Sequence, residues 1–127
     1  MTFSPRYQRL GTRAAAAERE RRRTLAELAP KSEAELRKTI RDALRQMGWV
    51  VRDLSQRRRV EGGLADMPDL IAWKHGRTLM IETKHGRNDL RDGQRDFARE
   101  IDSHCDPRSL VYCVARSLDD VLSALGL

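Results

Sequence analysis

The stretch that decides the fold is residues 67–84, which read MPDLIAWKHGRTLMIETK. Two apolar runs flank the turn-like residues KHGR, which is the sequence pattern of a β-hairpin. If His75 and Gly76 are the two loop residues, Gly76 supplies the positive φ that a tight hairpin requires. The sequence therefore predicts an antiparallel pair of strands whose register is set by this turn.

Counting outward from the turn pairs the residues as Lys74 with Arg77, Ala72 with Leu79, Leu70 with Ile81 and Asp69 with Glu82. Side chains directly opposite each other have Cβ atoms about 5 Å apart and lie on one face. The carboxylates of Asp69 and Glu82 then repel each other unless a cation lies between them. Lys84 follows Glu82 by two residues and projects from the same face. This surface has the groups needed for metal-assisted phosphodiester hydrolysis.

Length and composition fit one domain with one modest core. The chain has 127 residues, of which 35% are charged and only 5% aromatic, so the core must be mainly aliphatic. The net charge of +6 is uneven, because residues 1–31 carry eight Lys/Arg and three Asp/Glu. We therefore divide the chain into a basic N-terminal arm, residues 1–31, and a nearly neutral domain, residues 32–127. A basic arm suits a polyanion, most simply nucleic acid.

The two cysteines, Cys105 and Cys113, have neither the spacing nor the histidine neighbours of a zinc site. Two lone thiols in a chain of this size favour a reducing, cytoplasmic location. No apolar run reaches the length of a transmembrane helix, so we expect no membrane partner. We interpret both cysteines as core thiols, and Trp49 and Trp73 as residues that pack in the core or along a strand.

Helix propensity and apolar spacing place the other elements. Residues 1–12 are expected to be irregular, and residues 13–29 to form an exposed helix that ends before Pro30. Ser32 is expected to cap an amphipathic helix that ends at Gly48. The elements expected next are a strand at 49–54, a loop at 55–67, the hairpin, a helix from Gly93 to about Cys105 capped by Asp92, a strand at 110–114 and a helix capped by Ser117. The order from residue 32 is αβββαβα, an α/β core with a short mixed sheet flanked by helices.

This order of elements, with these residues, resembles the PD-(D/E)XK nuclease superfamily. Within it the chain is most similar to the virus-type replication-repair (VRR-NUC) nucleases and to the archaeal Holliday-junction resolvases. The resemblance spans about residues 32–122 and implies a restriction-endonuclease-like core. The residues that carry it are Glu33, Gly48-Trp49, Gly63, Met67-Pro68-Asp69-Leu70-Ile71, Ile81-Glu82-Thr83-Lys84, Gly86-Arg87, Leu90, Gly93-Gln94, Phe97 and Val111-Tyr112-Cys113-Val114-Ala115-Arg116-Ser117.

The resemblance implies a role for each residue of the motif. Asp69 and Glu82 would hold Mg²⁺ or Mn²⁺, with the backbone carbonyl of Thr83 as a third protein ligand. Lys84 would orient the attacking water or neutralise the charge that develops on the phosphate. Gln94 would contact the catalytic lysine or the phosphate.

A further acid is expected from the helix that begins after Ser32. Glu33 lies on the edge of the apolar face of that helix, three residues before Leu36, and so is turned towards the sheet. We therefore expect Glu33 to be the acid nearest the metal. Glu35 is the alternative, since it also occupies the first turn, where it would serve the helix cap.

Several arginines are candidates for contacts with nucleic-acid phosphates: Arg21, Arg22 and Arg23 of the arm, Arg57, Arg58 and Arg59 of the loop before Gly62, and Arg87. The Arg-rich loop departs from the usual pattern of the group and bears on substrate preference. The resemblance implies a metal-dependent endodeoxyribonuclease, selective for branched DNA such as a Holliday junction, in phage or host cytosol. It also implies a homodimer, because cutting a four-way junction needs two active sites.

Two other functions remain open at this point. The first is a nuclease fold that is used for DNA binding or assembly without cleavage, although such proteins normally lose an acid or the lysine. The second is an RNA-directed role, on which no residue of the sequence bears. Cleavage of duplex rather than branched DNA is a further possibility within the nuclease hypothesis.

Overall fold

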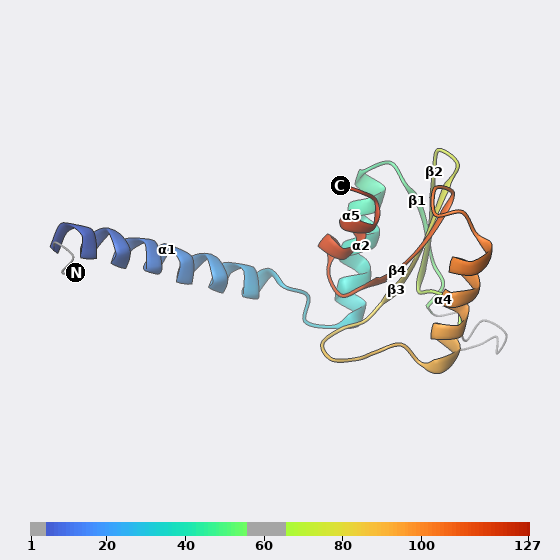
Figure 1. The fold of residues 1–127 in the computed structure, drawn as a ribbon, viewed down its shortest axis with the longest axis horizontal. Helices are drawn as coiled ribbons and strands as arrows, with labels where there is room; N and C mark the ends of the chain where they lie inside the picture. The colour runs from blue at the N-terminus through green and yellow to red at the C-terminus, as the bar shows by residue number, and fades with distance from the viewer. Residues whose placement is uncertain (1–4, 56–65) are drawn as a thin grey trace.

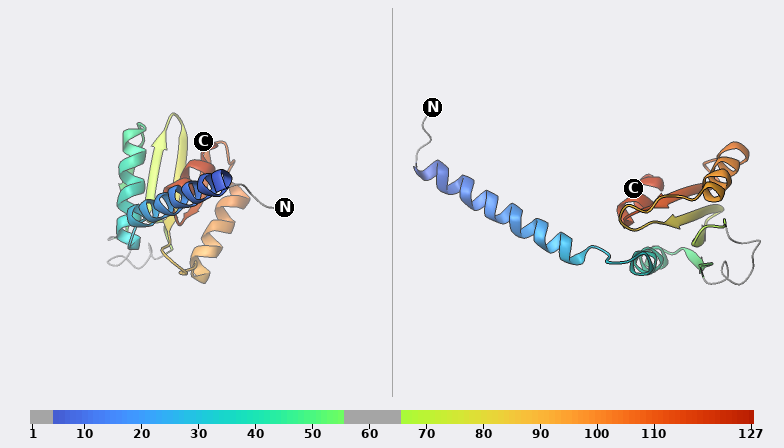
Figure 2. Two further views of the ribbon diagram at one scale, coloured as in Figure 1. Left: turned by 90° about the vertical axis from the view of Figure 1, so that its left-hand side faces the viewer. Right: turned by 90° about the horizontal axis from the view of Figure 1, so that it is seen from below.

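The fold is α/β, with a four-stranded mixed sheet and four helices in the part of the chain that the computed structural model describes, residues 5–55 and 66–127. Figure 1 shows helices on both sides of the sheet and one long helix, α1, that extends away from this body. The right-hand view of Figure 2 shows the same separation of α1 from the rest. The helices are α1 (Pro5–Leu28), α2 (Glu33–Gln46), α4 (Asp92–His104) and α5 (Leu118–Ala124).

The strands lie side by side in the order β1-β2-β3-β4. β1, β2 and β3 form an antiparallel meander, whereas β4 pairs with β3 in parallel. A parallel pair needs a crossover connection, and α4 lies within it. The strands are β1 (Val50–Asp53), β2 (Leu70–Lys74), β3 (Arg77–Thr83) and β4 (Leu110–Ala115).

The hairpin of β2 and β3 has the predicted register. The structure pairs Lys74 with Arg77, Ala72 with Leu79, and Leu70 with Ile81. Both loop residues have positive φ, +48° at His75 and +78° at Gly76. Positive φ at both central residues is the requirement of a type I′ turn, whose twist matches that of the flanking strands.

The core lies between one face of the sheet and the pair α2 and α5. Leu36, Ile40 and Leu44 recur every fourth residue of α2 and are fully buried. The predicted limits of α2 are confirmed: the Ser32 Oγ accepts a hydrogen bond from the Glu35 N–H (3.1 Å), and Gly48 follows the helix with φ of +92°. The residue before β1, the strands and α5 complete this core with Trp49, Val51, Leu70, Ala72, Leu79, Ile81, Cys113, Ala115 and Val121.

Two expected helix boundaries are wrong. α1 begins at Pro5 and not near residue 13, since proline is well suited to the first helical position and most residues after it favour helix. Asp92 does not cap α4; it is the first helical residue, and Arg91 is the N-cap. The Arg91 N–H donates to the side-chain oxygen of Gln94 (2.9 Å), so a residue within the helix does the capping.

The interpretation of the two tryptophans is half right. Trp49 is buried in the core, with 8% of its surface exposed, but Trp73 is 43% exposed on the other face of the sheet. Cys113 is a buried core thiol as expected, and burial, with a smaller contribution from Asp120, raises its pKa to about 11. Cys105 is only half-buried, at the end of α4.

Candidate metal centre

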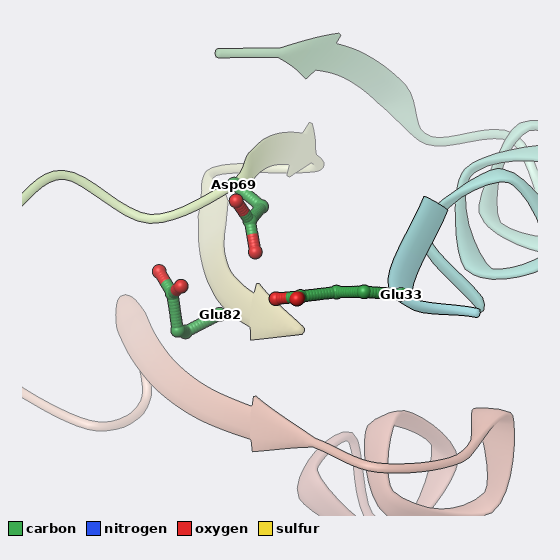
Figure 3. Close-up of side chains that lie close together, drawn as sticks. All are labelled: Glu33, Asp69 and Glu82. Atoms are coloured by element: carbon green, nitrogen blue, oxygen red, sulfur yellow. The ribbon is translucent and has the colours of Figure 1, made fainter. Parts of the chain in front are cut away.

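Three carboxylates meet at one end of the sheet. Asp69 immediately precedes β2, Glu82 lies near the end of β3, and Glu33 is the first residue of α2. One carboxylate oxygen of each lies within 4.8 Å of the others. Figure 3 shows the three side chains around a common space, each carried by a different element. The predicted juxtaposition of Asp69 and Glu82 is confirmed, and Glu33 joins them.

The charge of this cluster favours a bound cation. Asp69 and Glu82 are fully buried, and Glu33 is half-buried. The Lys84 ammonium, on a residue only 9% exposed, lies 3.8 Å from the Glu82 Oε1. Three carboxylates and one ammonium leave a formal charge of −2, which one divalent cation neutralises. A donor set made only of carboxylate oxygens is the kind that Mg²⁺ and Mn²⁺ prefer.

Thr83 fixes the orientation of Asp69. The Thr83 backbone N–H and its hydroxyl both donate to the Asp69 Oδ2, at 2.9 and 2.7 Å. The N–H and C=O of one strand residue point to the same neighbouring strand. The Thr83 carbonyl is therefore directed to the Asp69 side of β3, as a third protein ligand requires.

Gln94 fixes the orientation of Glu82. Its amide nitrogen donates to the Glu82 Oε1 (2.9 Å), and its amide oxygen accepts from the Arg91 N–H. The side chain is 1% exposed, so both hydrogen bonds are shielded from water. The predicted contact of Gln94 with the lysine takes another form, because Gln94 and Lys84 meet at the same oxygen of Glu82.

The start of α2 presents Glu33, and not Glu35, to the cluster. Glu35 is exposed, and its carboxylate accepts a hydrogen bond from the Lys31 N–H (3.4 Å) outside the first turn. A second contact holds this end of the helix, since the His85 Nε2 lies 3.0 Å from the Pro30 carbonyl oxygen. A carbonyl oxygen can only accept, so the donor of this hydrogen bond is the His85 Nε2–H. His85 directly follows Lys84, so this contact joins the end of β3 to the segment before α2.

Sequence reasoning missed Asp66, which lies against the first turn of α4. A Cβ added at Gly93 would lie 2.4 Å from the Asp66 Oδ1, so a larger residue there would require the exposed Asp66 carboxylate to move. A carboxylate near the N-terminus of a helix is favoured by the helix dipole. In the sequence, only Gly93 hinted at this contact. The neighbour that lies against Gly93 is identified only in the folded structure.

The predicted phosphate-contacting arginines are spread over the molecule. Arg21, Arg22 and Arg23 are exposed on α1, where the first two pair with Glu18 (2.9 and 3.2 Å) and the third pairs with Glu20. Arg87 is exposed in the loop that follows β3. Arg57, Arg58 and Arg59 lie outside the described residues.

Comparison of the chain with protein-family models, with curated proteins and with solved structures gave no match. Within residues 5–55 and 66–127, no helix has both the length and the apolar character needed to cross a membrane.

Proposed function

We propose that this chain is a divalent-metal-dependent endodeoxyribonuclease of the PD-(D/E)XK type, related to the VRR-NUC group and built on a restriction-endonuclease-like core. One observation carries the proposal: three carboxylates from three elements converge within 4.8 Å, with the Lys84 ammonium 3.8 Å from one of them. Buried like charges are costly to a fold. Their retention beside an oriented lysine is typical of a site selected for chemistry.

The carboxylates of Asp69, Glu82 and Glu33, with the Thr83 carbonyl, would hold the cation. When bound, Mg²⁺ or Mn²⁺ supplies Lewis-acid polarisation of a phosphodiester and activation of water. Thr83 holds Asp69 in place through two hydrogen bonds before any substrate arrives. A site arranged in advance in this way needs little reorganisation during the reaction.

Lys84 would act on the reacting atoms as a compact cation with rotatable donors. It is nearly buried, and its ammonium faces the carboxylates, so it can orient the attacking water or neutralise charge that develops on the phosphate. Gln94 is a positioning residue in this scheme. It ties the oxygen of Glu82 nearest Lys84 to the backbone of Arg91.

The proposed substrate is DNA, most specifically a branched structure such as a four-way junction, cut by a homodimer that brings two active sites together. The seven arginines and three glutamates of α1 give that helix a net positive charge. α1 extends away from the body (Figure 1), so its exposed arginines can track phosphates beyond the reach of the sheet.

A cleavage assay tests the proposal. A labelled four-way junction and a linear duplex are incubated with the protein in Mg²⁺, in Mn²⁺ or in EDTA. We expect cleavage with either metal and none in EDTA, with the junction cut faster than the duplex. Asp69→Asn, purified in the same way, reports any contaminating nuclease and should be inactive. DNA binding without cleavage under any metal would instead identify a binding module that uses a nuclease fold.

A further inference from the structure

The Glu33 carboxylate is the least constrained of the three in the candidate metal centre. Asp69 and Glu82 are both oriented by hydrogen bonds from buried neighbours. In the part of the chain that the structure describes, the Glu33 carboxylate makes no hydrogen bond or ion pair, and this residue is only half-buried. Its position therefore depends on the backbone at the start of α2, from which the side chain extends (Figure 3).

The first turn of α2 needs a restraint to keep Glu33 in place. Helix ends fray, and the three carboxylates repel one another while no cation is bound. Leu36 is fully buried and anchors α2 on the far side of this turn. The Ser32 cap closes the turn on itself but does not tie it to the sheet. A restraint on the near side has to come from residues 29–32, which join α1 to α2.

His85 ties this segment to the end of the sheet. Its Nε2–H donates to the Pro30 carbonyl oxygen, 3.0 Å away and three residues before Glu33. His85 and Pro30 are both half-buried, so the hydrogen bond is partly shielded from water. The two residues are 55 positions apart in the chain, so the bond joins two distant segments and not neighbours in one turn.

The backbone that carries His85 is itself held against the end of β4. On one side, the Lys84 N–H donates to the Ala115 carbonyl at 3.0 Å. On the other side, the Arg116 Nη1 donates to the Gly86 carbonyl, also at 3.0 Å. A ring that projects from a backbone held on both sides can keep the segment before α2 at a defined distance from the sheet.

We propose that His85 is a positioning residue for the candidate metal centre. By holding the Pro30 carbonyl, it keeps the first turn of α2 near the end of β3, and so keeps the Glu33 carboxylate beside the other two. His85 does not bind the cation in this scheme. The inference rests on the proposed function for the presence of a metal, and it adds a residue outside the ligand set on which metal affinity depends.

The Mn²⁺ affinity of the full chain without DNA tests the inference, measured from the paramagnetic resonance signal of the free ion. One net hydrogen bond corresponds to about 2- to 10-fold in an equilibrium constant, so we expect His85→Ala to weaken Mn²⁺ binding by this factor. His85→Gln carries its amide nitrogen as many bonds from Cβ as the ring Nε2 and should restore most of the affinity. His85→Asn is one bond shorter and should bind like His85→Ala. His104→Ala, at an exposed position of α4, should bind like the wild type.

A double-mutant cycle with Glu33 separates positioning from a general effect on the fold. If His85 acts through Glu33, His85→Ala in the background of Glu33→Ala should change the Mn²⁺ affinity less than about twofold. Additive losses of affinity would overturn the inference. So would a His85→Ala variant that is less stable in urea but binds Mn²⁺ as the wild type does.

The outcome is separable from that of the nuclease proposal. A chain that shows these coupled Mn²⁺ affinities but never cleaves DNA would retain the positioning role and lose the nuclease proposal. Where DNA is cleaved, excess Mn²⁺ should restore most of the rate of His85→Ala but not that of Lys84→Ala. Absence of Mn²⁺ binding by the wild type would overturn the metal centre together with this inference.

Discussion

At the scale of single residues, hydrogen bonds hold two carboxylates of the candidate metal centre in fixed orientations. Asp69 accepts two bonds from Thr83, and Glu82 accepts one from Gln94. These bonds fix the carboxylates at a separation that is unfavourable without a cation. The Lys84 ammonium, 3.8 Å from the Glu82 Oε1, offsets part of the negative charge.

Replacing Lys84 by alanine should abolish most of the cleavage. Removal of one preorganised charge or donor at a developing anion typically costs about 100- to 1000-fold in rate. We expect Lys84→Ala to lose activity by this factor while its circular dichroism and its DNA affinity stay close to those of the wild type. Lys38→Ala, at an exposed position of α2, is the matched control and should cleave normally. Cleavage by Lys84→Ala at near the wild-type rate would remove Lys84 from the reaction.

A comparison of Glu33→Gln with Glu35→Gln tests the third acid. Neutralising Glu33 relieves repulsion in the cluster, so the metal-free melting temperature should rise. The gain on adding Mn²⁺ should fall below the wild-type gain, which is about 2.7 kcal/mol at a hundredfold excess over the dissociation constant. Glu35→Gln should keep the full gain, because that side chain only caps α2. Equal metal responses in the two variants would exclude Glu33 from the site.

At the scale of elements, Asp66 lies against the start of α4, one residue before Gln94 in that helix. The Asp66 carboxylate occupies the space where a Cβ of Gly93 would lie. Gln94 is the next residue, so a shift of this helix end would move its amide away from Glu82.

Gly93→Ala should displace the exposed Asp66 carboxylate, so part of the stability of up to about 1 kcal/mol that alanine gains over glycine in a helix should be lost. In the background of Asp66→Ala, the same substitution should be neutral or stabilising, since the obstructing carboxylate is gone and alanine favours helix by up to about 1 kcal/mol. Urea unfolding of the four proteins of this cycle measures the coupling. Additive effects would show that the two residues do not interact.

The ion pair between Arg37 of α2 and Asp53 of β1 should make the stability of the fold depend on pH. Burial acts to raise the pKa of Asp53, but hydrogen bonds from Ser55 and the nearby Arg37 guanidinium outweigh it and lower the pKa below its ordinary 3.8. A lowered folded-state pKa stabilises the fold above the ordinary value, and this contribution is lost as the pH falls through the folded-state value. Asp53→Asn should therefore be less stable than the wild type at pH 7, with a difference that shrinks below about pH 4.

At the scale of the whole molecule, the chain separates a compact, nearly neutral body that carries the acidic site from a long basic helix. In Figure 1, and in the right-hand view of Figure 2, the α1 ribbon extends away from the body that contains the sheet. Such a separation suits a protein that gains affinity from phosphates in one place and performs chemistry in another.

Replacing Arg19, Arg21, Arg22 and Arg23 together by glutamine should keep α1 helical, since glutamine is a good helix former. DNA affinity should fall, and the slope of log K against log salt should flatten by about 0.9 for each phosphate that the helix no longer neutralises. Cleavage at saturating DNA should change little. An unchanged salt slope would mean that α1 serves a protein partner.

The sequence by itself determined the hairpin, its register and the meeting of Asp69 with Glu82. These features depend on interactions within 18 residues of chain, where turn chemistry and the alternation of side chains leave one arrangement. The start of α2 was equally predictable, because Ser32 and the stripe of Leu36 and Ile40 are local signals.

Only the tertiary structure decided the remaining features. The exposure of Trp73 depends on where α4 packs, and its choice of β4 leaves the other half of the sheet face open. The approach of Asp66 to Gly93 and the bond from Gln94 to Glu82 join segments that no local periodicity relates. These interactions join elements that are distant in the sequence, so no local sequence pattern predicts them.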